Sequence, residues 1–279
     1  MGKPVRIGVV APASRMDPGV PAEVEALVRR LYPDGRVEVV FDPQCFLVHN
    51  HFAGDDAARA EGFLRVANDP AFDALWFARG GYGSNRPAAA ILAGLTEAAR
   101  AKTYMGYSDA GFVLAGLYKA GIGRPAHGPV AHDIRREGGE AAIARALAWI
   151  ADGDRAALEP SLAHGQKAAA FNMTVLSQLL GTDLQPDLTG HVLMLEDVGE
   201  YLYRLDRTLF HLTSNPGIRK VAGIRLGRCS DIPENDPDFG MTAEDVCREW
   251  CARSGIPYLG RADIGHDAAN RVVPFGPRP

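Results

Sequence analysis

Ser108, in the stretch GYSDAG, is the serine of this chain best placed to act as a nucleophile. Among the eight serines, it alone follows a β-rich run (103–107) with a glycine two residues before it and a small alanine two residues after it, and a helical pattern begins directly beyond. A serine on such a tight strand-to-helix turn is exposed to substrate, and amides at the start of the helix face a developing oxyanion. Capping of that helix by the side chain of Ser108 or Asp109 explains the same pattern. The local sequence leaves both interpretations open.

A glycine-rich loop, ARGGYGSNR at 78–86, follows the third expected strand. Exposed backbone amides in such a loop can bind an anion. The loop lacks the Lys-Ser/Thr ending of a P-loop and does not match the dinucleotide-binding fingerprint. We interpret it as a tight turn or, if Ser108 is a nucleophile, as the source of a second donor to the oxyanion.

A serine nucleophile needs a general base and a carboxylate that orients it. Of the eight histidines, His266 in DIGHDAAN and His127 in PAHGPV each follow a β-rich run. His49 and His51 suit a metal ion, but no third ligand lies at a suitable spacing. Glu196 ends an apolar run, where a charge is costly unless it has a partner. Spacing alone does not decide among these residues.

The composition is that of an ordinary globular protein of 279 residues, with 47% apolar and 23% charged residues. A net charge of −4 and a pI near 6.1 provide no basic surface for nucleic acid or an anionic membrane. No apolar run approaches the ~20 residues of a membrane span, and we expect no signal peptide. The four cysteines form no disulfide framework, which fits a reducing cytoplasm. Cys247 and Cys251, four residues apart, are interpreted as buried thiols rather than metal ligands.

The elements that must position these residues alternate in the first half of the chain. Short β-rich runs at 5–10, 37–41, 74–78 and 103–107 alternate with helical patterns at 21–32, 54–69, 86–95 and 109–121. Such alternation predicts a parallel sheet with helices on both faces, here a flavodoxin-like domain over 1–152 that a helix at 139–153 closes. Ligands of such sheets bind at the carboxyl ends of the strands, which are the loops 11–15, 79–86 and 106–111.

The second half has a more mixed pattern. Residues 153–165 have no clear period and are expected to form a linker. Residues 166–279 are expected to form a second, smaller α+β domain, with helices at 171–181, 203–215 and 243–255 and strands at 191–198 and 221–229. Short β-rich runs near 257–265 and 271–276 complete it. The fold class is therefore α/β with two domains.

Five ordered motifs resemble those of the LD-carboxypeptidases: LWFARGGYGSNR, MGYSDAGFVLAGL, AHGPV, LMLEDVGEYLYRLDR and DIGHD followed by VVPFG. The resemblance covers nearly the whole chain. It implies a cytoplasmic serine peptidase of murein recycling that needs no cofactor or metal. It also implies that Ser108 is the nucleophile, His266 the base and Glu196 the acid that orients it. The implied oxyanion donors are the backbone amides of Gly81 and Asp109.

The resemblance also implies a substrate, a murein tetrapeptide in free or sugar-linked form that loses its terminal D-alanine, and a homodimer. An exopeptidase must bind a terminal carboxylate, for which arginine is the natural partner. The candidate substrate-binding residues are Arg79, Arg86, Arg204, Ser14, Phe171 and Asn172. Family members often have Gly-Gly-Asn where this chain has Ala-Phe-Asn at 170–172, and Gly-His-Gly where it has Gly-His-Asp at 265–267.

Three other functions remain as alternatives. An immunity-type peptidase of the same family cleaves toxic aminoacyl nucleotides and needs an aromatic surface for the base, which Phe171 could provide. A non-catalytic protein that binds a small ligand would keep the fold, but the intact serine, glutamate and histidine argue against it. A flavodoxin-like nucleotide-binding protein would need a phosphate motif that the sequence lacks.

Overall fold

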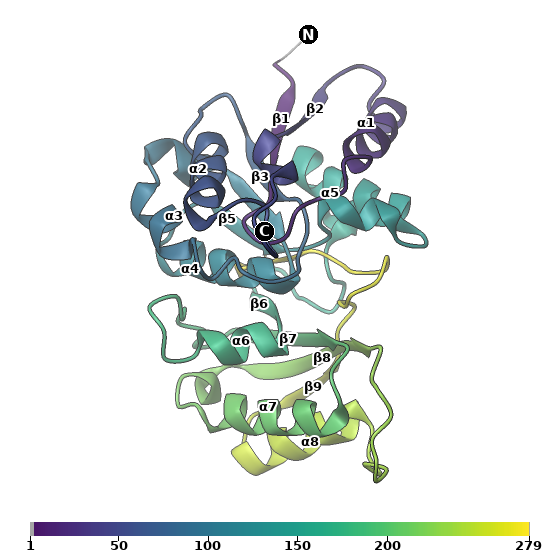
Figure 1. Cartoon of the computed structure of the whole chain (residues 1–279). Helices are drawn as coiled ribbons and strands as arrows, with labels where there is room; N and C mark the ends of the chain where they lie inside the picture. Colours follow the sequence, from purple (N-terminus) through teal and green to yellow (C-terminus); the bar gives the residue numbers. More distant parts are fainter. Residues whose placement is uncertain (1–2, 279) are drawn as a thin grey trace.

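The computed structural model describes residues 3–278 and contains two sheets, one above the other in Figure 1. The first sheet has the strand order β2-β1-β3-β4-β5-β10, in which β10 alone is antiparallel. Its strands are β1 (Val5–Val10), β2 (Val37–Phe41), β3 (Ala74–Phe77), β4 (Thr103–Gly106), β5 (Arg124–His127) and β10 (Val273–Pro274). The five parallel strands follow the flavodoxin-like order, as the alternation predicts.

Helices cover both faces of this sheet, because successive side chains of a strand point to opposite faces. Val9 and Trp76 pack into the cluster on the side of α1 and α5, whereas Val10 and Phe77 pack on the side of α2, α3 and α4. The five helices are α1 (Val20–Leu31), α2 (Asp56–Ala67), α3 (Ala88–Gly94), α4 (Gly111–Lys119) and α5 (Gly139–Asp152). The expected helices at both faces are confirmed.

The second sheet has the order β11-β6-β7-β8-β9, and its strands β6 to β9 are parallel. Its elements are β6 (Lys167–Asn172), α6 (Met173–Leu179), β7 (Val192–Val198), α7 (Leu202–Ser214), β8 (Gly223–Ser230), α8 (Ala243–Ser254), β9 (Tyr258–Arg261) and β11 (Gly276–Pro277). Leu193 and Leu195 of β7 pack with the apolar faces of the three helices. Met194 packs on the other face with Ile264 and Val273. The mixed domain expected here therefore consists of successive β-α-β units with one antiparallel strand.

The end of the chain joins the two sheets. β10 pairs with β5 of the first sheet, and β11 then pairs with β6 of the second. β10 lies within the expected second domain, 166–279, and in the β-rich run at 271–276, but it pairs with the first sheet. Residues 1, 2 and 279 of the expected domains lie outside the described residues.

The expected linker 153–165 is anchored rather than loose. Glu159 is buried, its backbone amide donates to the Val272 carbonyl at 2.9 Å, and its carboxylate accepts from the Asp263 amide at 3.1 Å. Within residues 3–278, no helix combines the length and the apolar character needed to cross a membrane.

Candidate active site

Ser108 lies on the tight turn between β4 and α4, in a short 3₁₀ helix (Ser108–Ala110). Its φ of 59° is in the left-handed region, which costs a non-glycine residue about 1–3 kcal/mol unless the surroundings hold it there. Gly106 permits the turn, because a Cβ at that position would lie 2.8 Å from the Cβ of Phe77. The Ser108 side chain makes no helix cap, so the capping interpretation is wrong. The turn instead presents its hydroxyl to a histidine.

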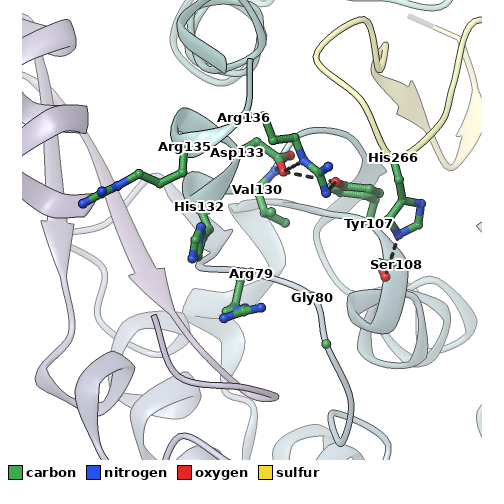
Figure 2. Close-up of a pocket in the computed structure, with 11 residues that line it drawn as sticks. Arg79, Gly80, Tyr107, Ser108, Val130, His132, Asp133, Arg135, Arg136 and His266 are labelled. Carbon is green, nitrogen blue, oxygen red and sulfur yellow. Dashed lines mark hydrogen bonds and ion pairs between the residues drawn. The ribbon is translucent and has the colours of Figure 1, made fainter. Parts of the chain in front are cut away.

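A hydrogen-bonded chain joins Ser108, His266 and Glu196. His266 Nε2 lies 3.0 Å from Ser108 Oγ, and His266 Nδ1 lies 2.5 Å from Glu196 Oε2 (Figure 2 shows the first of these bonds). Ser108 follows β4 of the first sheet, Glu196 is on β7 of the second, and His266 is in the loop between β9 and β10. The site therefore lies where the two sheets meet, and it is complete only when both are folded.

The environment of Glu196 and His266 favours a charged histidine. Glu196 is 0% exposed, and its Oε1 has no hydrogen-bond partner among the described residues. Burial lowers the pKa of His266, but the hydrogen bond and the negative charge of Glu196 outweigh burial and raise it above the ordinary value of 6.5. The Tyr107 ring packs edge-to-face on His266 with centroids 4.9 Å apart. An imidazolium that forms during a reaction would therefore be stabilised and held in place.

The Asp109 side chain shapes the glycine-rich loop. Its buried carboxylate accepts from the amides of Gly83 at 3.1 Å and Ser84 at 2.8 Å. Gly81 has a φ of 106°, and a Cβ there would collide with the Ser14 side chain, so only glycine fits. The loop is thus fixed against the turn that carries Ser108.

Two cavities meet at Ser108 and Gly81, which line both. The first has a volume of about 240 Å³ and is also lined by Arg79, Gly80, Tyr107, Val130, His132, Asp133, Arg135, Arg136 and His266 (Figure 2). The second has a volume of about 260 Å³ and is also lined by Tyr82, Asp109, Phe112, Asn172, Thr174, Val175, Gln178, Asp197, Val198 and Glu200. A bound molecule could extend on both sides of the serine hydroxyl.

Comparison with known proteins decides the family. Residues 7–128 match the LD-carboxypeptidase N-terminal domain and residues 168–278 match the LD-carboxypeptidase C-terminal domain. A putative carboxypeptidase of Synechocystis is 32% identical to this chain over 86% of this chain and 79% of its own length. The chain belongs to the LD-carboxypeptidase family. It is accordingly a carboxypeptidase of the serine type.

Other relatives agree with this membership. The murein tetrapeptide carboxypeptidase of Pseudomonas aeruginosa is 29% identical over 97% of this chain and 91% of its own length. A muramoyltetrapeptide carboxypeptidase structure from Oxalobacter formigenes superposes with a TM-score of 0.79, at 21% identity, over 98% of this chain and 93% of that one. The microcin C7 self-immunity protein MccF in complex with aspartyl sulfamoyl adenosine has a TM-score of 0.80 at 17% identity, over 99% of this chain and 92% of that one. These two structures share the fold.

Only one of the three candidate arginines lines either of the two cavities at Ser108. Arg79 is in the wall of the first cavity. Arg86 forms an ion pair with Asp56, at 2.9 Å, in a separate hollow away from Ser108, so its predicted contact with substrate is corrected. Arg204 pairs with Glu200 at 3.5 Å and lines neither cavity.

The other candidate contacts differ in their positions. Phe171 is 1% exposed and packs against Phe275, so it offers no face to a ligand, and the expected stacking surface is corrected. Asn172 lines the second cavity, where its amide nitrogen donates to Asp197 and its oxygen accepts from the Val175 amide at the start of α6. Ser14 packs against Gly81 and lines neither cavity.

Asn270 is a supporting residue that was not predicted from the sequence. Asn270 Oδ1 lies 3.0 Å from His127 Nε2 and also accepts from the Gly265 amide, which fixes the backbone next to His266. Burial lowers the pKa of His127 to about 4, so this candidate base is a neutral donor instead. His127 is the last residue of β5.

The remaining candidate metal ligands do not gather. Among residues 3–278, no group of three or more His, Cys, Asp or Glu side chains is arranged to hold a metal ion. His49 and His51 lie in an exposed turn. Cys247 and Cys251 are buried thiols within the core between α7, α8 and β8, in agreement with the interpretation from the sequence.

Proposed function

We propose that this carboxypeptidase releases the terminal D-alanine from murein tetrapeptides, in free or sugar-linked form, through an acyl-enzyme on Ser108. The observation that carries the proposal is the Ser108–His266–Glu196 hydrogen-bonded chain at the point where two cavities meet. The substrate class is supported by the relative named murein tetrapeptide carboxypeptidase, which aligns with 97% of this chain.

In the first half of the reaction, His266 Nε2 accepts the proton of Ser108 as its Oγ attacks the carbonyl of the L-centre of meso-diaminopimelate or lysine. Glu196 keeps the proton on Nδ1 and stabilises the imidazolium. The amides of Gly81 and Asp109 donate to the oxyanion, and each well-placed donor contributes about 3–4 kcal/mol. The C–N bond then breaks, and His266 gives its proton to the departing nitrogen of D-alanine.

In the second half, His266 takes a proton from a water molecule that attacks the acyl carbonyl. The ester bond to Ser108 breaks, the proton returns to Oγ, and the peptide leaves with a new carboxylate. Each proton removed from a nucleophile is thus delivered to a leaving group, and the enzyme returns to its starting state.

We further propose that the enzyme works in the cytoplasm as a homodimer in cell-wall recycling. The four cysteines are free, and three of them are fully buried, as suits a reducing compartment. Phe210 and Tyr203 of α7 are large exposed apolar side chains that a partner copy could cover. Light scattering of the purified protein tests the dimer.

One observation keeps the aminoacyl-nucleotide alternative open to test. Tyr82 lines the second cavity and is 53% exposed, so it offers an aromatic face that Phe171 does not. The non-catalytic alternative predicts no turnover of any peptide, although the hydrogen-bonded chain is intact.

The deciding experiment follows D-alanine release from L-Ala-γ-D-Glu-meso-diaminopimelate-D-Ala by the wild type, Ser108→Ala and Ser214→Ala. Ser214 is the matched control, because its hydroxyl bonds only within α7, to the Phe210 carbonyl. We expect release by the wild type and Ser214→Ala alone. Equal release by Ser108→Ala would refute the nucleophile. If the wild type releases no D-alanine but cleaves an aminoacyl sulfamoyl adenosine, the proposed substrate is wrong and the aminoacyl-nucleotide alternative is favoured.

A further inference from the structure

The first cavity contains three arginines, and two of them are already neutralised. Arg136 Nε donates to Asp133 at 2.8 Å, and its Nη2 donates to the Tyr107 hydroxyl at 3.2 Å. Arg135 pairs with Glu23 at 2.9 Å and points away from the cavity in Figure 2. Neither guanidinium needs a further anion.

Arg79 is different. Its hydrogen bond is to a neutral group, the Arg15 carbonyl at 3.2 Å, and within residues 3–278 no carboxylate lies in ion-pair range of it. Burial and the charge of Arg79 itself lower the pKa of the neighbouring His132, so that ring adds no competing charge at neutral pH. The Arg79 guanidinium is therefore a positive charge in the cavity wall that has no counter-ion among the described residues. A bound anion would neutralise it.

The loop that carries Arg79 also carries the proposed oxyanion donor. Arg79 is two residues before Gly81, and the two residues share the cavity with Ser108 and His266. Any group bound by Arg79 is thus held on the side of Ser108 from which His266 can deliver a proton to a leaving nitrogen. When the last residue of a peptide is released, the terminal carboxylate belongs to the same residue as that nitrogen.

The size and the charge of the two cavities bear on which part of the peptide each can hold. At about 30 Å³ of liquid volume per water molecule, 240 Å³ corresponds to about eight waters. This space is large enough for one small amino acid. The second cavity has no arginine or lysine in its lining but contains Asp197 and Glu200, so it offers no cationic partner to a terminal carboxylate, and its acids suit the free amino group of meso-diaminopimelate or lysine.

We infer that Arg79 binds the terminal carboxylate of the leaving residue, so that the first cavity holds that residue and the second cavity holds the acyl part of the peptide. This inference rests on the proposed function and assigns the orientation of its substrate. It makes Arg79 a specificity-determining residue, because an internal peptide bond or an amidated end would leave the guanidinium without its anion.

The test measures binding to Ser108→Ala protein, which does not depend on turnover. Calorimetry compares the tetrapeptide with its C-terminal amide on three proteins: Ser108→Ala alone, with Arg79→Gln, and with Arg86→Gln. We expect Ser108→Ala to bind the acid roughly 10- to 100-fold more tightly than the amide, the value of a charge-assisted hydrogen bond. Arg79→Gln should abolish this preference by weakening the acid alone, and the Arg86→Gln control should retain it.

Three results would overturn the inference. Equal weakening of acid and amide by Arg79→Gln would mean that Arg79 has only a structural role. An unchanged preference in Arg79→Gln would place the carboxylate elsewhere, and no preference in Ser108→Ala would mean that the carboxylate is not recognised. Hydrolysis by the wild type is measured separately. Absence of turnover together with an Arg79-dependent preference would refute the proposed reaction and retain the binding site.

Discussion

Replacing Glu196 with glutamine removes a buried charge with almost no change in volume. The carboxylate can only accept, so it holds a proton on His266 Nδ1 and leaves Nε2 free to take the proton of Ser108. A glutamine amide can donate to Nδ1 and favour the opposite tautomer. In serine triads this change lowers kcat about 10⁴-fold, which corresponds to about 5 kcal/mol of transition-state stabilisation. We expect a loss of that order here.

The same variant should shift the pH dependence. In the wild type the charge of Glu196 raises the pKa of His266 above 6.5 in spite of burial, and the base works only when neutral. Activity should therefore fall as the pH drops through that raised pKa. In Glu196→Gln, burial remains and lowers the pKa, so the acid limb of the residual activity should move to lower pH.

The assay is the initial rate of D-alanine release from about pH 5 to 8, the range over which histidine titrates, with Glu249→Gln as control. Glu249 is an exposed acid on α8 whose partner is Arg253. Thermal unfolding of each variant separates chemistry from folding. Because Glu196 Oε1 lacks a partner, removal of its charge should leave Tm unchanged or raised. A well-folded variant with nearly wild-type kcat would refute the orienting role.

Two further substitutions test the groups that support the site. Asp109→Asn should lower kcat and destabilise the fold by about 1–3 kcal/mol, since one of the two loop amides loses its acceptor. Faster amide exchange at Gly83 or Ser84 checks this, and unchanged exchange at both would contradict it. Asn270→Ala should lower kcat at constant KM, because the His127 and Gly265 donors lose the oxygen that fixes the loop. Steady-state kinetics distinguish that result from a rise in KM, which would assign Asn270 to substrate binding.

Much of the first sheet could be predicted because local and tertiary preferences agree there. The runs at 5–10, 37–41, 74–78 and 103–107 are β-branched or aromatic and buried, so pattern and packing agree. Asp55 caps α2 by accepting from the Ala58 amide, and aspartate is a favoured residue at that position. The turn at Ser108 could be predicted for the same reason. A tight strand-to-helix turn needs small residues at neighbouring positions, and the local sequence shows them.

Two strands were missed because tertiary context overrides their composition. β6 contains three consecutive alanines, the best helix formers, and forms a strand because β7 and β11 pair with its two edges. Phe171 falls in this strand rather than in the expected helix, and it is buried for that reason. β5, with arginine and proline in four residues, gives no periodic signal either.

Prediction of the active site from the sequence was limited in the same way, because tertiary structure brings its residues together. Residue types suggested a nucleophile, an acid and a base, but Ser108, Glu196 and His266 are distant in sequence, and only a resemblance to known proteins paired them. The Asp109 carboxylate was missed because its partners, the amides of Gly83 and Ser84, are backbone groups that any residue provides.

The position of β10 and β11 near the end of the chain has a consequence for synthesis. A chain is made from its N-terminus at about 5–20 residues per second, and domains fold as they emerge. The sheet that carries Ser108 can assemble early, but its β5 edge and the β6 edge of the second sheet receive their partners last. His266 and both of these strands leave the ribosome after every other catalytic element. A nascent chain therefore lacks its proposed base until His266 has emerged, and the contacts that assemble the Ser108–His266–Glu196 chain are long-range in sequence.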